Sequence, residues 1–210
     1  MLKILAVDDH AVVRKGVKAL FEKRQDSVVV GEANSAPEAL RCVREQDWDI
    51  VILDITLGDR SGIEVMKELK LLRPNLPVLI LSMHSEEQYA RRAFKAGASG
   101  YITKDTVPDE LLKAITRVAQ GGKYVSSELA ESLVRDVDGG IAREPYERLS
   151  DRELEILVLI ASGKTVGEIA VQLSRSVKTI STYRARILEK MGMRTNAELT
   201  LYAINQKLVE

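Results

Sequence analysis

The feature that most constrains the fold is an alternation between two kinds of segment over residues 1 to about 120. Five short apolar runs, KILAV, SVVVGE, DIVILD, PVLILS and GYIT, are separated by longer segments whose apolar residues recur at helical spacing. Strands separated by helices pair in parallel through crossover connections, which place helices on both faces of the sheet. The pattern therefore predicts an α/β fold with a doubly wound, five-stranded parallel sheet.

Local signals mark the starts of several helices in this first part. Ser35 with Glu38, and Ser85 with Gln88, have the spacing of a capping box, in which each residue's side chain bonds the other's backbone N–H. Pro108 stands where the first turn of a helix tolerates proline. These signals predict helices that begin near residues 36, 86 and 108.

Helix and strand breakers then interrupt the chain. Gly139, Gly140 and Pro145 disrupt every periodic pattern, and a short helix over about 126–137 is expected to lead into them. We therefore expect a first domain over residues 1–122, a linker with a short helix over 123–146, and a second domain over 147–210.

The second domain shows only helical patterns. Its predicted helix starts are three capping boxes and one further cap, and glycines stand where two helices are expected to end in a left-handed residue. The boxes are Ser150 with Glu153, Thr165 with Glu168 and Thr195 with Glu198, the further cap is Ser176, and the glycines are Gly163 and Gly192. A small all-α module of four helices follows.

Composition restricts the class of protein but names no partner. The chain has 31 Lys and Arg residues and 31 Asp and Glu residues, so its overall charge is neutral. The single cysteine, Cys42, excludes an internal disulfide framework and fits a reducing compartment. No apolar run reaches the roughly 18 residues that a membrane span needs. We expect a cytoplasmic protein without a membrane partner.

Polar residues stand at the ends of four of the five predicted strands. Asp8 and Asp9 follow the first strand, Asp54 ends the third, Ser82 ends the fourth and Lys104 follows the fifth. Parallel strands present their carboxyl ends, where ligands bind, at one edge of the sheet. Three crowded carboxylates need a cation, and all-oxygen ligation suits Mg²⁺. The alternative is that each acid only caps the helix after its strand.

Such an edge suits phosphoryl transfer with Asp54 as the nucleophile. We expect this carboxylate to be ionised at pH 7 without a general base, while Mg²⁺ and the ammonium of Lys104 neutralise the charge of the transferring group. The hydroxyl of Ser82 would be placed to donate a hydrogen bond to a phosphate oxygen.

The motifs AVDDH, ILDI, LS and YITKD, in this order, resemble the receiver domain of bacterial two-component response regulators over about residues 1 to 120. The resemblance implies a flavodoxin-like receiver in which Asp54 accepts a phosphoryl group from a sensor histidine kinase. It also implies that Ser82 and Lys104 contact that group and that Tyr101 changes rotamer in response to Ser82. The implied Mg²⁺ ligands are Asp8, Asp9, Asp54 and the backbone carbonyl of Thr56.

One departure from the receiver pattern lies beside the phosphoacceptor. Members of this family often have Met-Pro after the phosphorylated strand, whereas this chain has Leu57-Gly58. Glycine is conformationally less constrained than proline, so the stiffness of this loop is expected to differ.

The second domain carries a concentrated basic helix. Residues 175–194 contain six Lys and Arg residues against the single acidic residue Glu189, a net charge of +5. The layout of a short helix over about 165–173, a tight turn and a long helix from Ser176 is that of a helix-turn-helix, whose second helix enters the major groove of DNA. We expect Val177, Ile180, Ile187, Leu188 and Met191 to face the core. The expected outward set is Lys178, Ser181, Thr182, Ala185 and Arg186.

The stretch from LSDRELEIL to AELTLYA strongly resembles the LuxR-type helix-turn-helix, which behind a receiver defines the NarL/FixJ subfamily. The resemblance implies that Lys178, Ser181 and Thr182 read bases, and that Thr179, Tyr183 and Arg184 lie near the DNA backbone. The outward-facing Arg186 is a further DNA candidate. Two positions depart from common members, which often have Lys at Ser181 and His at Tyr183.

Three other sequence features are given structural interpretations. SGKT at 162–165 ends like a P-loop, but position 158 is a valine where that motif needs glycine, so Gly163 is interpreted as a helix end. His10 and His84 lack metal-ligand spacing and are not predicted ligands, although by resemblance His84 lies where family members tune dephosphorylation. Cys42 and Trp48 are interpreted as packing residues.

These observations predict a phosphorylation-controlled transcription regulator rather than an enzyme. Phosphorylation is expected to draw Ser82 toward the phosphoryl group and to turn Tyr101 inward. The resemblance to this family implies that activation then frees the second domain to dimerise, largely through its last helix, about 196–206, and a two-fold dimer would bind two half-sites of promoter DNA. Two alternatives remain: a phosphotransferase with an aspartate nucleophile, and a protein-interaction module whose helix-turn-helix does not bind DNA.

Overall fold

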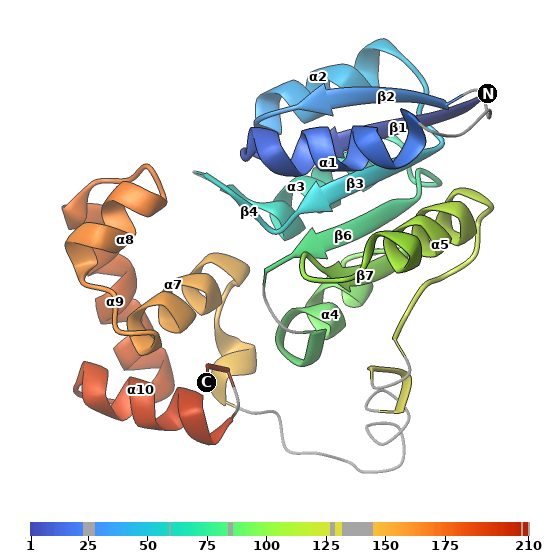
Figure 1. The fold of residues 1–210 in the computed structure, drawn as a ribbon. Helices are drawn as coiled ribbons and strands as arrows, with labels where there is room; N and C mark the ends of the chain where they lie inside the picture. The colour runs from blue at the N-terminus through green and yellow to red at the C-terminus, as the bar shows by residue number, and fades with distance from the viewer. Residues whose placement is uncertain are drawn as a thin grey trace. The chain divides into compact units, whose positions relative to one another are not determined.

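The computed structural model comprises two compact units, residues 1–139 and 140–210. It describes residues 1–22, 28–58, 60–83, 86–126, 129–131, 145–206 and 208–209. Figure 1 shows the sheet and its helices in the first unit, and the cluster of short helices in the second. Within the described residues, each helix falls short of the length and apolar character that a membrane crossing needs.

The first unit contains the five-stranded parallel sheet that the sequence predicts. Its strands are β1 (Leu2–Val7), β2 (Val28–Ala33), β3 (Ile50–Asp54), β6 (Val78–Ser82) and β7 (Gly100–Thr103). They pair in the order β2-β1-β3-β6-β7, and each pair is parallel. This is the flavodoxin-like order, in which the strand sequence reverses at β1 and β3. The predicted fold class is confirmed.

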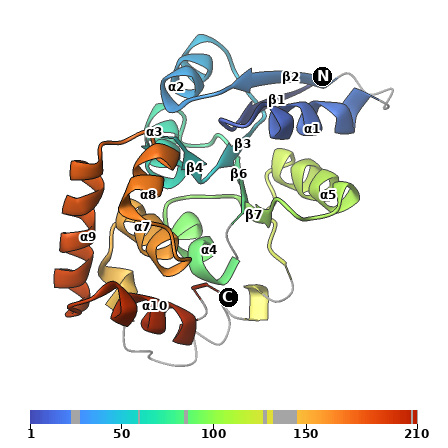
Figure 2. The same ribbon diagram turned by 60° about the vertical axis from the view of Figure 1, so that its left-hand side comes forward.

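Helices cover both faces of this sheet (Figures 1 and 2). On one face lie α1 (Ala11–Glu22) and α5 (Pro108–Ala119), and on the other lie α2 (Ala36–Glu45), α3 (Gly62–Leu72) and α4 (Glu86–Lys95). Alternate residues of each strand point to opposite faces, so Ile4, Ile52 and Leu81 join the core beneath α1 and α5. Strands buried on both faces explain why the apolar runs are nearly continuous.

A small hairpin after β3 was not predicted. Strands β4 (Thr56–Leu57) and β5 (Arg60–Ser61) pair antiparallel in the segment that leads to α3. Gly58 has a φ of 48° there, in the left-handed region. Proline is fixed near a φ of about −65° and could not adopt this conformation. The departure from Met-Pro therefore allows this tight turn.

The helix-start predictions in the first unit have mixed outcomes. Pro108 does stand in the first turn of α5. Ser35 precedes α2, but its side chain makes no capping hydrogen bond, and the carboxylate of Glu38 accepts from the backbone N–H of Asn34, at 2.8 Å, rather than from that of Ser35. The prediction of a capping box at Ser35 was therefore wrong. Ser85 lies outside the described residues.

The second unit contains the four predicted helices. They are α7 (Asp151–Ala161), α8 (Val166–Gln172), α9 (Val177–Met191) and α10 (Asn196–Asn205), preceded by a short 3-10 helix, η1 (Pro145–Arg148). Most of the helix expected over 126–137 lies outside the described residues.

Local sequence signals account for the ends of these four helices. Ser150 and Thr165 form complete capping boxes with Glu153 and Glu168, and Ser176 caps α9. Thr195 also caps its helix, but Glu198 accepts from Arg194 rather than completing the box. The left-handed residues expected at Gly163 and Gly192 have φ values of 84° and 66°.

One ion pair and one hydrogen bond from a buried arginine join α7 to the helix-turn-helix. Glu153 is nearly buried, and its carboxylate lies 2.6 Å from the ammonium of Lys190 on α9. Burial raises the pKa of Glu153, but hydrogen bonds from Lys190 and Ser150 outweigh this effect and hold the pKa below its usual value. Arg152 lies 2.7 Å from Glu155 and also donates to the carbonyl of Leu173, at the turn before α9. These contacts fix the turn and α9 against α7.

The indole of Trp48 packs directly against a glycine of β2. A Cβ atom added at Gly31 would lie 2.2 Å from ring atom Cη2 of Trp48. The indole N–H donates to the carbonyl of Cys42 at 3.1 Å, which fixes the ring over this strand. Trp48 is 8 % exposed and Cys42 is half-buried, so their interpretation as packing residues is confirmed.

We predict that Gly31→Ala lowers the free energy of unfolding of the first unit by about 1–3 kcal/mol, the usual cost of overpacking. The matched control is Gly16→Ala in α1, where an added Cβ meets nothing within 4 Å. That change should stabilise by about 0.5–1 kcal/mol, because alanine is the better helix former. Urea unfolding followed by fluorescence of the lone tryptophan measures both. Equal effects of the two changes would contradict the prediction.

Candidate functional site

Three strand ends meet at the carboxyl edge of the sheet around the ammonium of Lys104. Lys104 Nζ lies 2.7 Å from Asp54 Oδ2, at the end of β3, and 2.7 Å from Asp8 Oδ2, just after β1. The side chains of Asp8 and Asp54 are 4 % and 3 % exposed, and that of Lys104 is 9 % exposed. The structure therefore brings together residues that lie far apart in the sequence.

Asp9 and His10 extend this cluster toward solvent. His10 Nδ1 lies 2.7 Å from Asp9 Oδ1 and 3.2 Å from Asp8 Oδ1, and the backbone N–H of His10 also donates to Asp8. One possible ligand atom from each of Asp8, Asp9, His10 and Asp54 lies within 4.8 Å of the others. Sequence spacing gave no sign that the His10 ring belongs to this cluster.

The backbone beneath Asp54 depends on a glycine that sequence analysis did not single out. A Cβ added at Gly62, the first residue of α3, would lie 2.0 Å from the carbonyl oxygen of Asp54. The N–H of Gly62 donates to the carbonyl of Ile55 at 2.6 Å. The start of α3 is therefore pressed against the strand end that carries Asp54. A glycine eight residues after the aspartate was the available signal.

The electrostatic state of Asp54 differs from the sequence expectation. Burial is the main effect on Asp54 and raises its pKa to about 7. The charge of Asp8 also raises this pKa, whereas the ammonium of Lys104 and a backbone hydrogen bond from Thr56 lower it. Lys104 stays protonated because Asp54 and Asp8 raise its pKa despite its burial. Without a metal, Asp54 is therefore only about half ionised at pH 7, less than the sequence suggested, because burial opposes the charged form.

The donor set fits a divalent cation. Carboxylate oxygens crowd the cluster, and the ammonium of Lys104, 2.7 Å from the buried Asp8 Oδ2, supplies one positive charge among them. A hard cation such as Mg²⁺ takes oxygen ligands of this kind and keeps several waters, for which the half-exposed Asp9 leaves an open side.

The remaining receiver residues of the sequence prediction lie on the same strands or next to them. Asp54 pairs with Leu81, so Ser82 stands one residue further along the neighbouring strand, fully buried. The carbonyl of Ser82 accepts a hydrogen bond from the N–H of Lys104 at 2.7 Å. Tyr101, on β7, is also fully buried. Thr56 begins β4, two residues after Asp54.

The helix-turn-helix in the second unit presents most of the predicted DNA-facing residues to solvent. Lys178, Ser181, Thr182 and Arg186 are exposed, whereas Thr179, Tyr183 and Arg184 are intermediate. Ile180, Ile187 and Met191 are buried as expected. Val177 was wrongly predicted to face the core, because it is 55 % exposed. It is the first residue of α9, and helical side chains lean toward the preceding turn, which here lies outside the helix.

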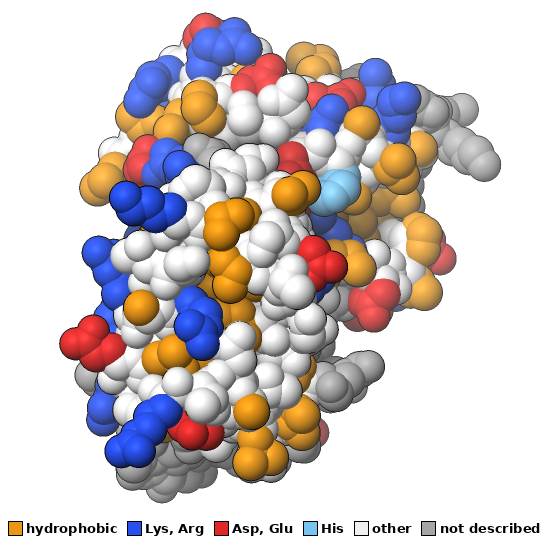
Figure 3. Space-filling view, turned by 90° about the vertical axis from the view of Figure 1, so that its left-hand side faces the viewer, with side chains coloured by type: hydrophobic (Ala, Val, Ile, Leu, Met, Phe, Trp, Pro, Cys, Tyr) orange, Lys and Arg blue, Asp and Glu red, His pale blue; other side chains and the backbone are white. Residues whose placement is uncertain are grey.

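Some basic side chains of this region are held within the unit. The Nε of Arg184 donates to Asn196 of α10 at 2.5 Å, and Lys190 pairs with Glu153. The exposed cations of residues 175–194 thus include Arg175, Lys178, Arg186 and Arg194. Figure 3 shows Lys and Arg side chains spread along the left of the visible face, with apolar side chains between them.

The segment that ends like a P-loop has a structural role instead. Gly163 follows the end of α7, and Thr165 caps the start of α8, as the interpretation against a P-loop requires.

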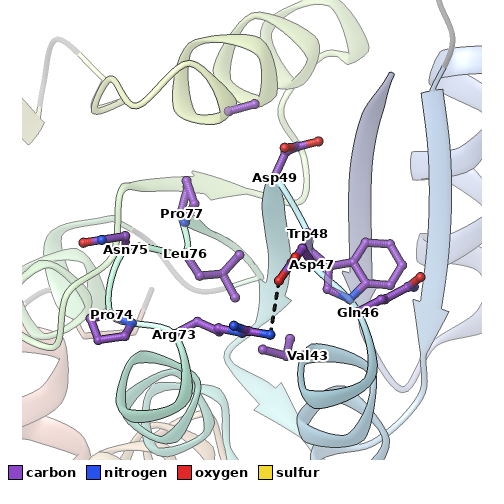
Figure 4. A pocket seen from close by; sticks show the side chains of 11 residues that line it. Val43, Gln46, Asp47, Trp48, Asp49, Arg73, Pro74, Asn75, Leu76 and Pro77 are labelled. Carbon is purple, nitrogen blue, oxygen red and sulfur yellow. Dashed lines mark ion pairs between the residues drawn. The ribbon is translucent and has the colours of Figure 1, made fainter.

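A separate pocket lies at the opposite edge of the sheet, near the amino ends of β3 and β6. Its volume is about 400 Å³, and the segments 46–49 and 73–77 supply most of its walls. Figure 4 shows Arg73 reaching across it to Asp47, with which it forms a 3.1 Å ion pair. Ligands of parallel sheets bind at the carboxyl edge, so this pocket is not the candidate site.

Comparisons with known proteins agree with the geometry of both units. Residues 4–116 match the model of the response regulator receiver domain, and residues 147–203 match that of bacterial regulatory proteins of the luxR family. The chain belongs to the response regulators. It is a phosphorylation-controlled, DNA-binding transcription regulator, as members of this family are, and such regulators interact with histidine kinases.

Similar regulators cover nearly the whole chain. Response regulator UvrY of Escherichia coli K12 is 32 % identical over 99 % of this chain and 96 % of its own length. Response regulator GacA of Pseudomonas aeruginosa is 33 % identical over 100 % and 99 %. The structure of RcsB from Salmonella enterica serovar Typhimurium, bound to promoter rprA with phosphomimetic BeF3−, matches with a TM-score of 0.63 at 27 % identity. The match covers 96 % of this chain and 97 % of the RcsB chain.

We predict that the carboxyl of Asp54 in the metal-free regulator titrates near pH 7, measured by carbon NMR. Lys104→Met should raise this pKa and Asp8→Asn should lower it, because each removes one charge that acts on Asp54. Because this pKa lies above the value of about 3.9 in the unfolded chain, protonated Asp54 favours the folded state. The free energy of unfolding that it contributes is fully present below about pH 4 and is lost as pH rises through about 7. Asp54→Asn should abolish this loss. Titration of Asp54 near pH 4 would contradict the prediction.

Proposed function

We propose that Asp54 is the phosphoacceptor of this regulator and receives its phosphoryl group from a sensor histidine kinase. The observation that carries this proposal is the buried Asp54 carboxylate, which lies 2.7 Å from the ammonium of Lys104 within a cluster of acids. A carboxylate oxygen of Asp54 would form a bond to phosphorus while the bond from phosphorus to the kinase histidine breaks. The same bond could form from acetyl phosphate, with acetate as the leaving group.

We propose that Asp8, Asp9, Asp54 and the backbone carbonyl of Thr56 hold Mg²⁺ for this reaction. The bound ion would neutralise charge on the phosphoryl oxygens and favour the ionised form of Asp54. Lys104 holds the second positive charge at Asp54 Oδ2 and stays protonated because of its acidic neighbours. Ser82 stands next along the edge, and its hydroxyl would donate a hydrogen bond to a phosphoryl oxygen.

The switch that we propose runs from Ser82 to Tyr101 through neighbouring strands. Ser82 pairs with Thr103, two residues after Tyr101, and the N–H of Lys104 is bonded to the carbonyl of Ser82. A shift of Ser82 toward the phosphoryl group would therefore move β7 as well. The full burial of Tyr101 on β7 supports this proposal, because a shift of β7 would change the packing around its ring.

For the output unit, we propose that α9 reads promoter DNA in the major groove. Lys178, Ser181 and Thr182 would contact bases, and Thr179, Tyr183, Arg184 and Arg186 would lie near the backbone. The exposure of Lys178, Ser181, Thr182 and Arg186, together with the RcsB–promoter complex, supports this proposal. Dimerisation of the phosphorylated regulator through α10 is supported by Leu201 and Ile204, which are 62 % and 48 % exposed.

Other features of the prediction remain proposals. The two compact units support domain limits of 1–122, 123–146 and 147–210. Promoter binding requires a regulator that shares a compartment with DNA, so we propose a cytoplasmic location. We do not propose phosphate-ester turnover, because a phosphotransferase with an aspartate nucleophile would need a second acid, and Thr56 stands two residues after Asp54.

We predict that Asp54→Asn and Asp54→Ala both abolish labelling by radioactive acetyl phosphate, because neither side chain offers a carboxylate nucleophile. Removal of divalent cations with EDTA should abolish labelling of the wild type. Asp105→Asn is the matched control, since Asp105 is an exposed acid on the same edge, next to Lys104. Labelling that survives both changes at Asp54 would overturn the phosphoacceptor assignment.

We predict that Lys178→Ala reduces the preference of the phosphorylated regulator for its selected DNA site over scrambled DNA by about tenfold, the value of one good base contact. The site is first selected from random duplexes, and fluorescence anisotropy at several salt concentrations measures the affinities. Lys113→Ala, on α5 of the first unit, removes the same charge and should change nothing. Affinity that does not fall with salt would instead favour the protein-interaction alternative.

A further inference from the structure

His10 brings a nitrogen ligand to a site that otherwise offers oxygen. Its Nδ1 lies 2.7 Å from Asp9 Oδ1 and 3.2 Å from Asp8 Oδ1, between the two acids that follow β1. The backbone N–H of His10 donates to Asp8 Oδ1 at 2.8 Å, so the loop itself directs this residue toward the cluster. One ring nitrogen and three carboxylates thus have ligand atoms within 4.8 Å of one another.

We propose that His10 is a metal ligand that lets this site bind Zn²⁺, and transition-metal ions of similar chemistry, in place of Mg²⁺. Mg²⁺ prefers oxygen ligands, whereas imidazole nitrogen suits zinc and other transition metals. Zn²⁺ favours four ligands, and one nitrogen with carboxylate oxygens is a set that it accepts. The inference rests on the proposed metal site and adds a residue to it.

Two features of the cluster favour a cation in contact with His10. The imidazole nitrogen lies close to two carboxylates. A cation bound between these carboxylates would therefore also lie close to the ring nitrogen. Asp8 Oδ2 is buried with the ammonium of Lys104, 2.7 Å away, as its charged partner, and a carboxylate oxygen has further lone pairs with which it can accept a metal. The His10 side chain is 68 % exposed, so its ring has room to turn and present a nitrogen lone pair to an ion.

Zinc bound in this way would oppose phosphorylation. The carboxylate of Asp54 would be tied to an ion whose preferred four positions are largely filled by protein atoms, leaving less room for a phosphoryl oxygen. The regulator would then respond to the ratio of free Zn²⁺ to free Mg²⁺, with His10 as the residue that sets the threshold.

Calorimetry of the full-length regulator with Zn²⁺ and with Mg²⁺ tests the proposal. The protein carries Cys42→Ser and no histidine tag, so that neither a thiol nor a tag binds zinc. We expect His10→Ala to weaken Zn²⁺ binding by at least about tenfold, in the range seen when a metal site loses a supporting partner. Mg²⁺ affinity should stay within about twofold, because oxygen ligands and water dominate its binding. His10→Asn, which offers an amide oxygen, should keep Mg²⁺ binding and lose the zinc preference.

Nitrogen NMR of the two imidazole rings gives a readout that is independent of phosphorylation. His10→Ala identifies the His10 signals, and in the wild type Zn²⁺ should shift one of them while Mg²⁺ leaves both in place. Unshifted His10 signals with Zn²⁺ bound, or equal zinc affinity in His10→Ala, would overturn the proposal. An Mg²⁺ affinity that does not fall in Asp54→Asn would instead overturn the proposed metal site itself, which separates the two failures.

Discussion

The buried ion pair between Asp54 and Lys104 is the interaction on which the receiver unit depends. A charged carboxylate at the end of an apolar strand is costly unless a partner compensates for the lost water. Lys104 reaches back from the end of β7 to within 2.7 Å of both Asp54 and Asp8. Because those acids sit on β3 and after β1, one ammonium joins three strand ends. Without that ammonium, two buried acids would face each other with no positive charge between them. Because a single ammonium is shared by both acids, a second cation at this edge is favourable.

Sequence reasoning located this site because the geometry of parallel strands leaves few choices. If Asp8, Asp54, Ser82 and Lys104 each follow a strand of one parallel sheet, their side chains share an edge whatever the loops do. The contribution of Gly62 depends on how closely α3 approaches the backbone of Asp54, and no local pattern encodes that distance. The pKa of Asp54 was misjudged for the same reason, because the extent of burial is a tertiary property.

The helical unit shows the same division between local and tertiary information. Caps at Ser150, Thr165 and Ser176 form as predicted, because at the start of a helix the N-cap hydroxyl lies close to the N–H three residues later. Val177 was misplaced because helical periodicity gives a residue's direction but not whether a neighbour covers it. Arg184, which looked like a DNA contact alone, also bonds to Asn196, so its charge helps to hold α9 to α10.

Phosphorylation would redistribute the charges around Lys104. Before transfer, the ammonium is shared between Asp8 and Asp54. A phosphoryl group on Asp54 would replace the single carboxylate charge with up to about two charges and bring three acceptor oxygens, which would compete with Asp8 for the ammonium. Since the N–H of Lys104 is bonded to the carbonyl of Ser82, a movement of Lys104 toward the phosphoryl group pulls on the ends of β6 and β7 together. Under the proposed function, the residue that makes the buried acid tolerable would therefore also be the one through which its modification reaches β6 and β7.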